Sequence, residues 1–406
     1  MKHFPGIISI SIGCGPRSRG ALRSAALVLC AQAVAAADPA GSPNPADLDA
    51  EMRELAAYRQ ALDDAIAERG PYSPELAETY QGFSHYLQQR GRHADALAML
   101  RKARHLERVN HGINSAAQIP VLHGMLASYR ATGQVEATTD VHRELLRLAE
   151  RGLAAGDPAR ITLLHDAARW HLAAHLIDAD ALRLAHLQAA DELLERAWRL
   201  AETQAAATAI RAALLRDRAL LHFHVLRDRD NRSREPQAPA GYRLASEVPG
   251  TGVHTLTASI GGGRELLEAR IALLERETPA ATAELRRARL DLADWELLFD
   301  GAKPAVRSYR KLLAEGPDAD ALFAAPLPLP AARADGDPQL TARIRLDVSA
   351  DGRPDHIELL DSAPFSDPEQ RHRILRAVRE TRFRPVFSGG EPVASAGAVI
   401  AFPLAD

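Results

Sequence analysis

Residues 74–108 have the sequence PELAETYQGFSHYLQQRGRHADALAMLRKARHLER. Apolar side chains recur three and four positions apart on both sides of Gly91, as they do on amphipathic helices. Gly91 interrupts this pattern, which places a turn there. The second half carries the small residues Ala96 and Ala103 opposite larger apolar positions of the first half. The stretch therefore predicts two antiparallel helices that pack closely.

The same pattern recurs along the chain. Gly133 follows Gly91 by 42 residues (133 − 91), a third helix pair begins near Ile161, and a fourth is predicted over 279–314 with its turn at Asp300. This arrangement resembles the tetratricopeptide repeat, although the spacing is longer than the roughly 34 residues usual there. The resemblance implies a groove that binds a protein or peptide, with predicted contacts at Tyr80, Phe83 and Tyr129. The alternative is that these rings only stack the helices of the array.

Composition agrees with a mainly helical protein. Aromatic residues make up 5% of the chain, whereas alanine, leucine and arginine, which lose little on entering a helix, are abundant. The formal net charge of −3 gives no electrostatic reason to expect binding to nucleic acid.

The N-terminal segment has the features of a secretory signal. A basic flank ending at Arg23 precedes a short apolar run over 25–34, and three alanines follow up to Ala37. Cleavage after Ala37 would release a periplasmic protein without cysteine, because both cysteines of the chain, at positions 14 and 30, precede it. Retention as a weak membrane anchor and acylation of Cys30 are the alternatives, and membrane contact is expected only in those cases.

The periodicity changes near the C-terminus. Residues 340–348 alternate apolar and polar side chains, as a half-buried strand does, and a turn at Asp351 leads into a second strand over 356–360. Asp367 then opens a helix, and a last strand is predicted over 395–404. We therefore expect the order strand, strand, helix, strand.

This module resembles the C-terminal domain of TonB-family proteins. The resemblance rests on a V-x-x-D-G-x phrase at 348–353, an R-F-x-P phrase at 382–385, a G-x-P-V phrase at 390–393 and the late aromatic Phe402. It implies binding of an extended peptide by strand addition, in which main-chain hydrogen bonds supply affinity. The predicted edge strand comprises Ala398, Val399, Ile400, Ala401 and Phe402. The helix before it has a basic side from Arg371 to Arg384, interpreted as a solvated face or as a contact for an acidic partner or a lipid head group.

Motifs that would carry enzymatic chemistry are not found. His171 and His175 have the i, i+4 spacing of a zincin, but Leu172 stands where that motif needs glutamate, so packing is the preferred interpretation. The glycines at 261–263 lack the order of a phosphate-binding loop and are interpreted as a flexible linker. We therefore expect no enzyme activity, no metal and no cofactor, with a hydrolase hidden in the array as the enzymatic alternative.

The fold class predicted is mainly α: a tetratricopeptide-like α-solenoid followed by a small α+β domain of TonB C-terminal type. The predicted segments are a signal peptide (1–37), a linker (38–47), helical repeats (48–226), an irregular insertion (227–264), a further repeat pair (265–316), a proline-rich linker (317–338) and the TonB-like domain (339–406). The expected function is an exported scaffold for protein or peptide partners, among them an outer-membrane protein. The alternative is an energy transducer for outer-membrane transport.

Overall fold

The structure is a computed structural model, and it describes residues 45–177, 180–234, 256, 258–277, 283–314, 323–330, 341–361 and 368–403. The chain divides into two compact units, 1–57 and 58–406. Of the first unit, the described part is the beginning of helix α1 (Pro45–Arg69). The predicted signal segment lies outside the described residues. No helix within the ranges given above is long and apolar enough to cross a membrane.

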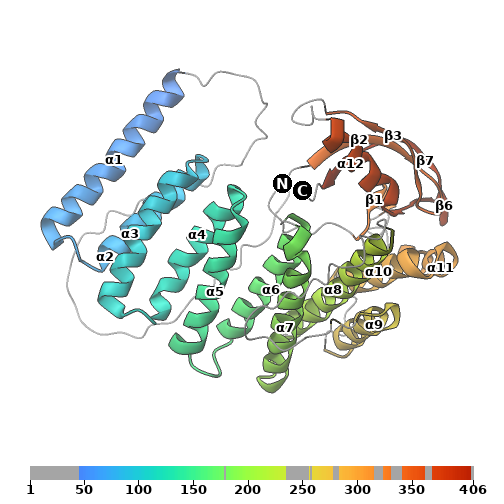
Figure 1. Cartoon of the computed structure of the whole chain (residues 1–406), viewed down its shortest axis with the longest axis horizontal. Coiled ribbons are helices and arrows are strands. Elements are labelled where there is room, and N and C mark those ends of the chain that lie inside the picture. Colours follow the sequence, from blue (N-terminus) through green and yellow to red (C-terminus); the bar gives the residue numbers. More distant parts are fainter. Residues whose placement is uncertain are drawn as a thin grey trace, which may run out of the picture. The chain divides into compact units, whose positions relative to one another are not determined.

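The second unit consists mainly of helices that pair in chain order (Figure 1). Among the described residues, ten consecutive α-helices each contact the next one in the chain, so that they form five hairpins. A short 3₁₀ helix, η1 (Ala116–Gln118), precedes α4. The hairpin helices are α2 (Glu75–Gln89), α3 (His93–His111), α4 (Ile119–Ala131), α5 (Val135–Gly152), α6 (Ala159–Ile177), α7 (Asp180–Thr203), α8 (Thr208–Arg234), α9 (Ile260–Glu277), α10 (Ala283–Phe299) and α11 (Ala302–Leu313).

In each of the first two hairpins, a glycine turn joins the two helices, as predicted. Gly91 and Gly133 have φ values of 69° and 66°, in the left-handed region that glycine adopts without a steric penalty. After Gly91, the Arg92 N–H donates to the Leu87 carbonyl at 2.9 Å, which closes a Schellman motif and satisfies a helix-end carbonyl. The small side chain of Ala96 is fully buried in the interface between the helices. The predicted helix pairs are confirmed.

The predicted bounds of the irregular insertion, 227–264, are wrong at both ends, because helices extend into it from each side. Helix α8 continues to Arg234, and α9 begins at Ile260, so the three glycines lie within a helix and do not form a linker. A Cβ atom at Gly263 would overlap the ring of Trp295, and one at Gly262 would lie 2.7 Å from the His222 ring. Close packing of helices thus explains the glycines. Most of the insertion, residues 235–255 and 257, lies outside the described residues.

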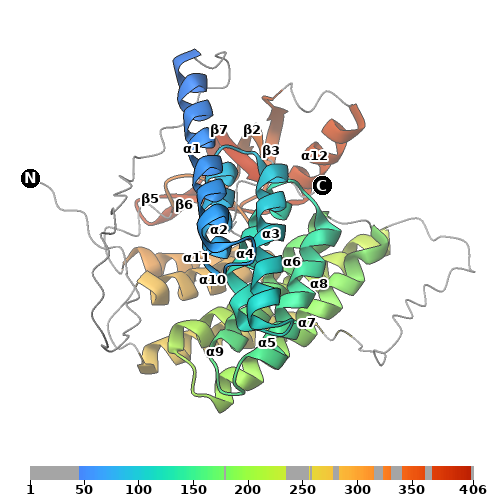
Figure 2. The ribbon, with the colours of Figure 1, turned by 90° about the vertical axis from the view of Figure 1, so that its left-hand side faces the viewer.

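The C-terminal part contains a three-stranded antiparallel sheet in the order β3-β2-β7. Its strands are β2 (Thr341–Val348), β3 (Pro354–Leu359) and β7 (Ser395–Pro403), and α12 (Pro368–Glu380) packs against β3 (Figures 1 and 2). Ala342, Ile344, Leu346 and Val348 are all buried at 1% exposure or less. The alternation of the first strand and the order strand, strand, helix, strand are therefore confirmed. Three short strands complete this part: β4 (Phe383–Arg384), β5 (Val386–Ser388) and β6 (Glu391–Val393).

Where it is described, the predicted proline-rich linker is packed into the fold. Strand β1 (Leu327–Pro328) pairs with β4 of the C-terminal sheet region. Phe323 and Leu329 are 1% and 2% exposed, and both lie in one apolar cluster with Tyr309 of α11. Burial of these large side chains is favourable by a few kcal/mol, which outweighs the preference of the neighbouring prolines for an extended spacer. The segment 323–330 therefore joins the array to the C-terminal sheet.

Candidate functional site

A buried ion pair joins strand β4 of the C-terminal part to helix α10 of the array. Arg384, from the R-F-x-P phrase, donates from Nε to Asp294 Oδ1 at 2.9 Å and from Nη2 to Oδ2 at 2.5 Å. Asp294 lies on α10, and its carboxylate also accepts a hydrogen bond from the Tyr309 hydroxyl at 2.8 Å. The two charged side chains are only 3% and 6% exposed. Arg384 is thus a structural anchor and is not part of a solvated basic face.

The electrostatics of this cluster follow from its burial. Desolvation opposes the charge of Arg384, but Asp294 more than offsets this, so that the pKa of the guanidinium is raised. Burial also raises the pKa of the Tyr309 hydroxyl well above its ordinary value, and the neighbouring carboxylate acts in the same direction. Tyr309 therefore stays protonated and donates to Asp294.

The two phrases that carry the resemblance to the TonB C-terminal domain contact each other. The Phe383 N–H donates to the Gly352 carbonyl at 2.9 Å, and the Arg382 guanidinium lies 3.8 Å from the Asp351 carboxylate. Gly352 has φ of 77°, and a Cβ there would overlap the Phe383 carbonyl oxygen. Only glycine fits this turn without strain. The D-G phrase and the R-F phrase are therefore parts of one structural contact.

The predicted edge strand lies at an edge of the sheet. On β2, the Arg343 carbonyl accepts from the Leu360 N–H at 2.9 Å, so the backbone of Arg343 faces the β3 side. Successive residues of a strand direct their backbone groups to opposite sides, so Ile344 faces β7, where it is paired with Ile400. It follows that Val399 and Ala401 direct their N–H and C=O groups away from β2. Within the described residues, no strand pairs with that side of β7.

The side chains of β7 alternate in the same register. Phe402, opposite Ala342, is buried, and Ile400 packs at the border of the same core. Val399 lies opposite Arg345 on the other face and is 52% exposed. Ala398 is half-buried and Ala401 is exposed. The predicted edge residues thus divide into three on the core face that bond to β2, Ala398, Ile400 and Phe402, and two whose backbone groups point away from β2, Val399 and Ala401.

The opposite edge of the sheet is less regular. Strand β3 begins with Pro354, which has no N–H to donate, and His356 has φ of 48°. The pairing of β2 with β3 shifts register between Arg345 and Asp347, and that of β2 with β7 shifts between Leu346 and Val348, so the β7 edge is regular only over residues 398–402. Proline and bulges are the usual features that keep a sheet edge from pairing with another chain. Of the two edges, β7 is the one suited to accept a strand.

The structure places the three predicted groove residues inside the helix packing. Tyr80, Phe83 and Tyr129 are 8%, 5% and 9% exposed. Phe83 stacks on the Tyr58 ring with centroids 5.0 Å apart, and the Lys102 ammonium lies over the Tyr80 ring. Each ring thus has neighbours within the array, and less than a tenth of its surface is left for a ligand. Their placement favours the alternative, in which they stack helices.

Several histidines meet in the middle of the array. His171 and His186 approach with their Nδ1 atoms 2.8 Å apart, and His175 packs edge-on against His224 with ring centroids 4.5 Å apart. His175 is 4% exposed, and neither of its ring nitrogens has a hydrogen-bond partner. Burial lowers the pKa values of His171 and His175 to about 4, with that of His142 at about 3. The described residues contain no group of metal-binding side chains.

Sequence reasoning assigned no role to Asp294, and it placed Arg384 among the solvated arginines. The sequence offers a weak signal, because Asp294 is an acidic residue among the apolar positions of α10. In the structure Asp294 is buried, with 4% of its surface exposed. A buried carboxylate needs a cationic partner, which can come from any distance along the chain. Here the partner is 90 residues away.

Comparison with known proteins gives distant likenesses of fold. No protein-family model matches the chain, and no curated protein matches it. Among solved structures, a putative kinesin light chain from Podosopora anserina with nearly identical TPR-like repeats is 15% identical, with a TM-score of 0.43 over 59% of this chain and 94% of that chain. BtubC from P. vanneervenii is 10% identical, with a TM-score of 0.45 over 71% of this chain and 97% of that chain. Likenesses at this distance carry no functional argument, so function is argued from the sites.

Proposed function

We propose that this chain is an exported periplasmic scaffold that binds partner proteins and whose C-terminal sheet accepts an extended peptide along β7. The observation that carries the proposal is the regular, outward-facing edge formed by Val399 and Ala401. Strand addition needs such a row of backbone groups, and it requires no catalytic group or cofactor. The resemblance of the sheet to the TonB C-terminal domain, based on the D-G and R-F phrases, supports the same mode of binding.

In this mode, the main chain of the partner pairs with the backbone of Val399 and Ala401. Side chains of the partner strand lie alternately over the two faces of the sheet. On the exposed face they would meet Val399 and, on the next strand, Arg343 and Arg345. Arg345 is already paired with Glu358 at 2.7 Å, whereas the exposed Arg343 has no ion pair within the described part of the chain. An apolar or acidic residue in the partner strand therefore suits this face.

Site-specific crosslinking in cells tests the proposal. A photoreactive phenylalanine replaces Val399 in one variant and Glu358 in a control variant, since both positions are exposed on the same face but lie on opposite edges. We expect a crosslinked protein from position 399 and none from position 358. Capture at both positions, or at neither, would contradict strand addition at β7.

A proline substitution supplies a sharper version of this test. Ala401→Pro removes an N–H that points away from β2, so the ladder within the sheet stays intact while an incoming strand loses a donor. Crosslinking from position 399 should fall about tenfold, with an unchanged urea midpoint showing that the sheet remains folded. Undiminished crosslinking in the folded variant would mean that the partner does not pair with this edge.

Export is tested separately. We expect a mature protein that begins at Asp38 in the fraction released by osmotic shock. A protein that keeps its N-terminal segment and sediments with the inner membrane would instead favour the energy-transducer alternative, which needs a membrane anchor.

A further inference from the structure

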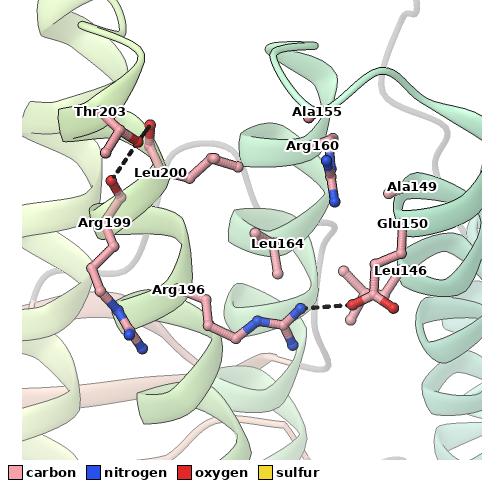
Figure 3. A pocket seen from close by; sticks show the side chains of 10 residues that line it. All are labelled: Leu146, Ala149, Glu150, Ala155, Arg160, Leu164, Arg196, Arg199, Leu200 and Thr203. Carbon is pink, nitrogen blue, oxygen red and sulfur yellow. Dashed lines mark hydrogen bonds and ion pairs between the residues drawn. The ribbon is translucent and has the colours of Figure 1, made fainter.

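A pocket of about 450 Å³ opens at one end of the helices α5, α6 and α7 (Figure 3). It lies where α5 ends, α6 begins and α7 ends, with Ala155 of the α5–α6 connection at its border. Leu146, Leu164 and Leu200, one from each helix, supply its apolar surface. Its volume falls within the range of roughly 300–1,000 Å³ that is usual for ligand pockets.

Three arginines surround this apolar surface: Arg160 from α6, and Arg196 and Arg199 from α7. In Figure 3 the Arg196 guanidinium extends toward Glu150 on α5, and the two are joined at 2.7 Å. Glu150 is the one acidic residue among those that line the pocket. The lining thus carries three positive charges and one negative charge, although the whole chain has a net charge of −3.

The ion pairs already present leave cationic capacity for a ligand. Arg199 lies 3.5 Å from Glu195 one helical turn earlier, but both side chains are more than half exposed, and such pairs contribute little. Arg160 is half-buried, and its guanidinium forms no salt bridge or hydrogen bond with the described residues. A guanidinium held in this way beside an apolar surface is suited to a carboxylate, which it can bind through two parallel hydrogen bonds.

We propose that this pocket binds a short acidic segment of a partner protein. An aliphatic side chain of that segment packs against Leu164 and Leu200, and neighbouring carboxylates pair with Arg160 and Arg199. Apolar burial supplies affinity, while the positive rim selects acidic segments and speeds their association. The site is distinct from the β7 edge, so the chain has two separate binding elements.

A peptide array with the full chain tests this inference. Seven-residue peptides carry Leu, Ile, Phe or Ala at the centre and Glu, Gln or Lys on both sides, and affinities of the best sequences are then measured by fluorescence anisotropy. We expect the strongest binding from Glu-flanked aliphatic peptides, with at least a tenfold loss when Glu is changed to Gln or when the central residue is Ala. Equal binding of Glu-flanked and Gln-flanked peptides, or no saturable binding, overturns the proposal.

The pocket variant is the double variant Arg160→Glu with Arg199→Glu. Its control changes Arg108→Glu and Arg307→Glu at exposed positions of α3 and α11, so that the net charge falls by the same amount in both. An acidic residue at position 160 lies in the first turn of α6, where a negative charge is favourable, so the variant is expected to fold. The double variant should lose at least tenfold in affinity, and the control less than twofold. Equal losses in both would show that only net charge matters and would overturn the site. Crosslinking from position 399 is unaffected in either case, which separates this inference from the proposed function.

Discussion

Loss of the buried arginine that joins the C-terminal sheet to the array is expected to be costly. In Arg384→Met, the Asp294 carboxylate loses two hydrogen bonds and its cationic partner but stays within the core at 6% side-chain exposure. Removal of one partner of a buried ion pair typically costs about 3–5 kcal/mol, because the remaining charge is uncompensated. We therefore expect the free energy of unfolding to fall by about that amount. Methionine retains most of the aliphatic packing, so the loss reports on the charge.

Urea unfolding followed by circular dichroism measures this effect, and amide hydrogen exchange of β2 and β7 shows whether the sheet opens first. The control is Arg345→Met, whose pair with Glu358 is 49% and 59% exposed and should contribute less than about 1 kcal/mol. The double variant Asp294→Leu with Arg384→Met removes both charges and should recover much of the loss. If Arg384→Met costs no more than Arg345→Met, the pair does not hold the sheet in place.

Two further outcomes follow from the array. The pKa values of His171 and His175 are lowered from 6.5 to about 4 by burial, so the unfolded chain binds protons first as pH falls. The contribution of the two neutral histidines to stability is complete above pH 6.5 and is lost as pH falls toward 4, and each histidine accounts for about 3 kcal/mol. The urea midpoints at pH 7.5, 5.5 and 4.5 should therefore decrease in that order. Gly263→Ala should lower the free energy of unfolding by about 1–3 kcal/mol, because the added Cβ overlaps Trp295. Gly261→Ala should raise it by up to about 1 kcal/mol, because no atom lies within 4 Å of the added Cβ and alanine favours a helix. Equal melting temperatures of the two variants would exclude the close packing at Gly263.

The features that sequence reasoning predicted well depend on local chemistry. Gly91 ends a helix through its own backbone conformation, and alternation over 340–348 decides which face of a strand is buried. Helix α6 likewise begins at Ala159, close to the predicted start of the third pair near Ile161. Each of these signals is contained in a few neighbouring residues, so one sequence is enough to detect it.

The features that were missed depend on contacts between distant segments. The glycines at 261–263 favour a flexible loop by composition, whereas the distant residues Trp295 and His222 leave no room for a Cβ atom at Gly263 and Gly262 of helix α9. The prolines after Pro326 suggest a spacer, but Phe323 and Leu329 are buried beside Tyr309. The arginine pocket is of the same kind, because its members come together only after three helices have packed.

The joint between the array and the sheet also affects how a partner with two binding segments is selected. Because the Asp294–Arg384 pair and the β1–β4 pairing attach the C-terminal part to α10 and to the segment 323–330, we expect the separation between the α5–α7 pocket and the β7 edge to be restricted. For a bivalent ligand on such a frame, avidity depends on whether its connecting segment can span that separation, and it is greatest when the mean length of the segment matches it. The protein would then discriminate between ligands that carry the same two motifs by the length of chain between them.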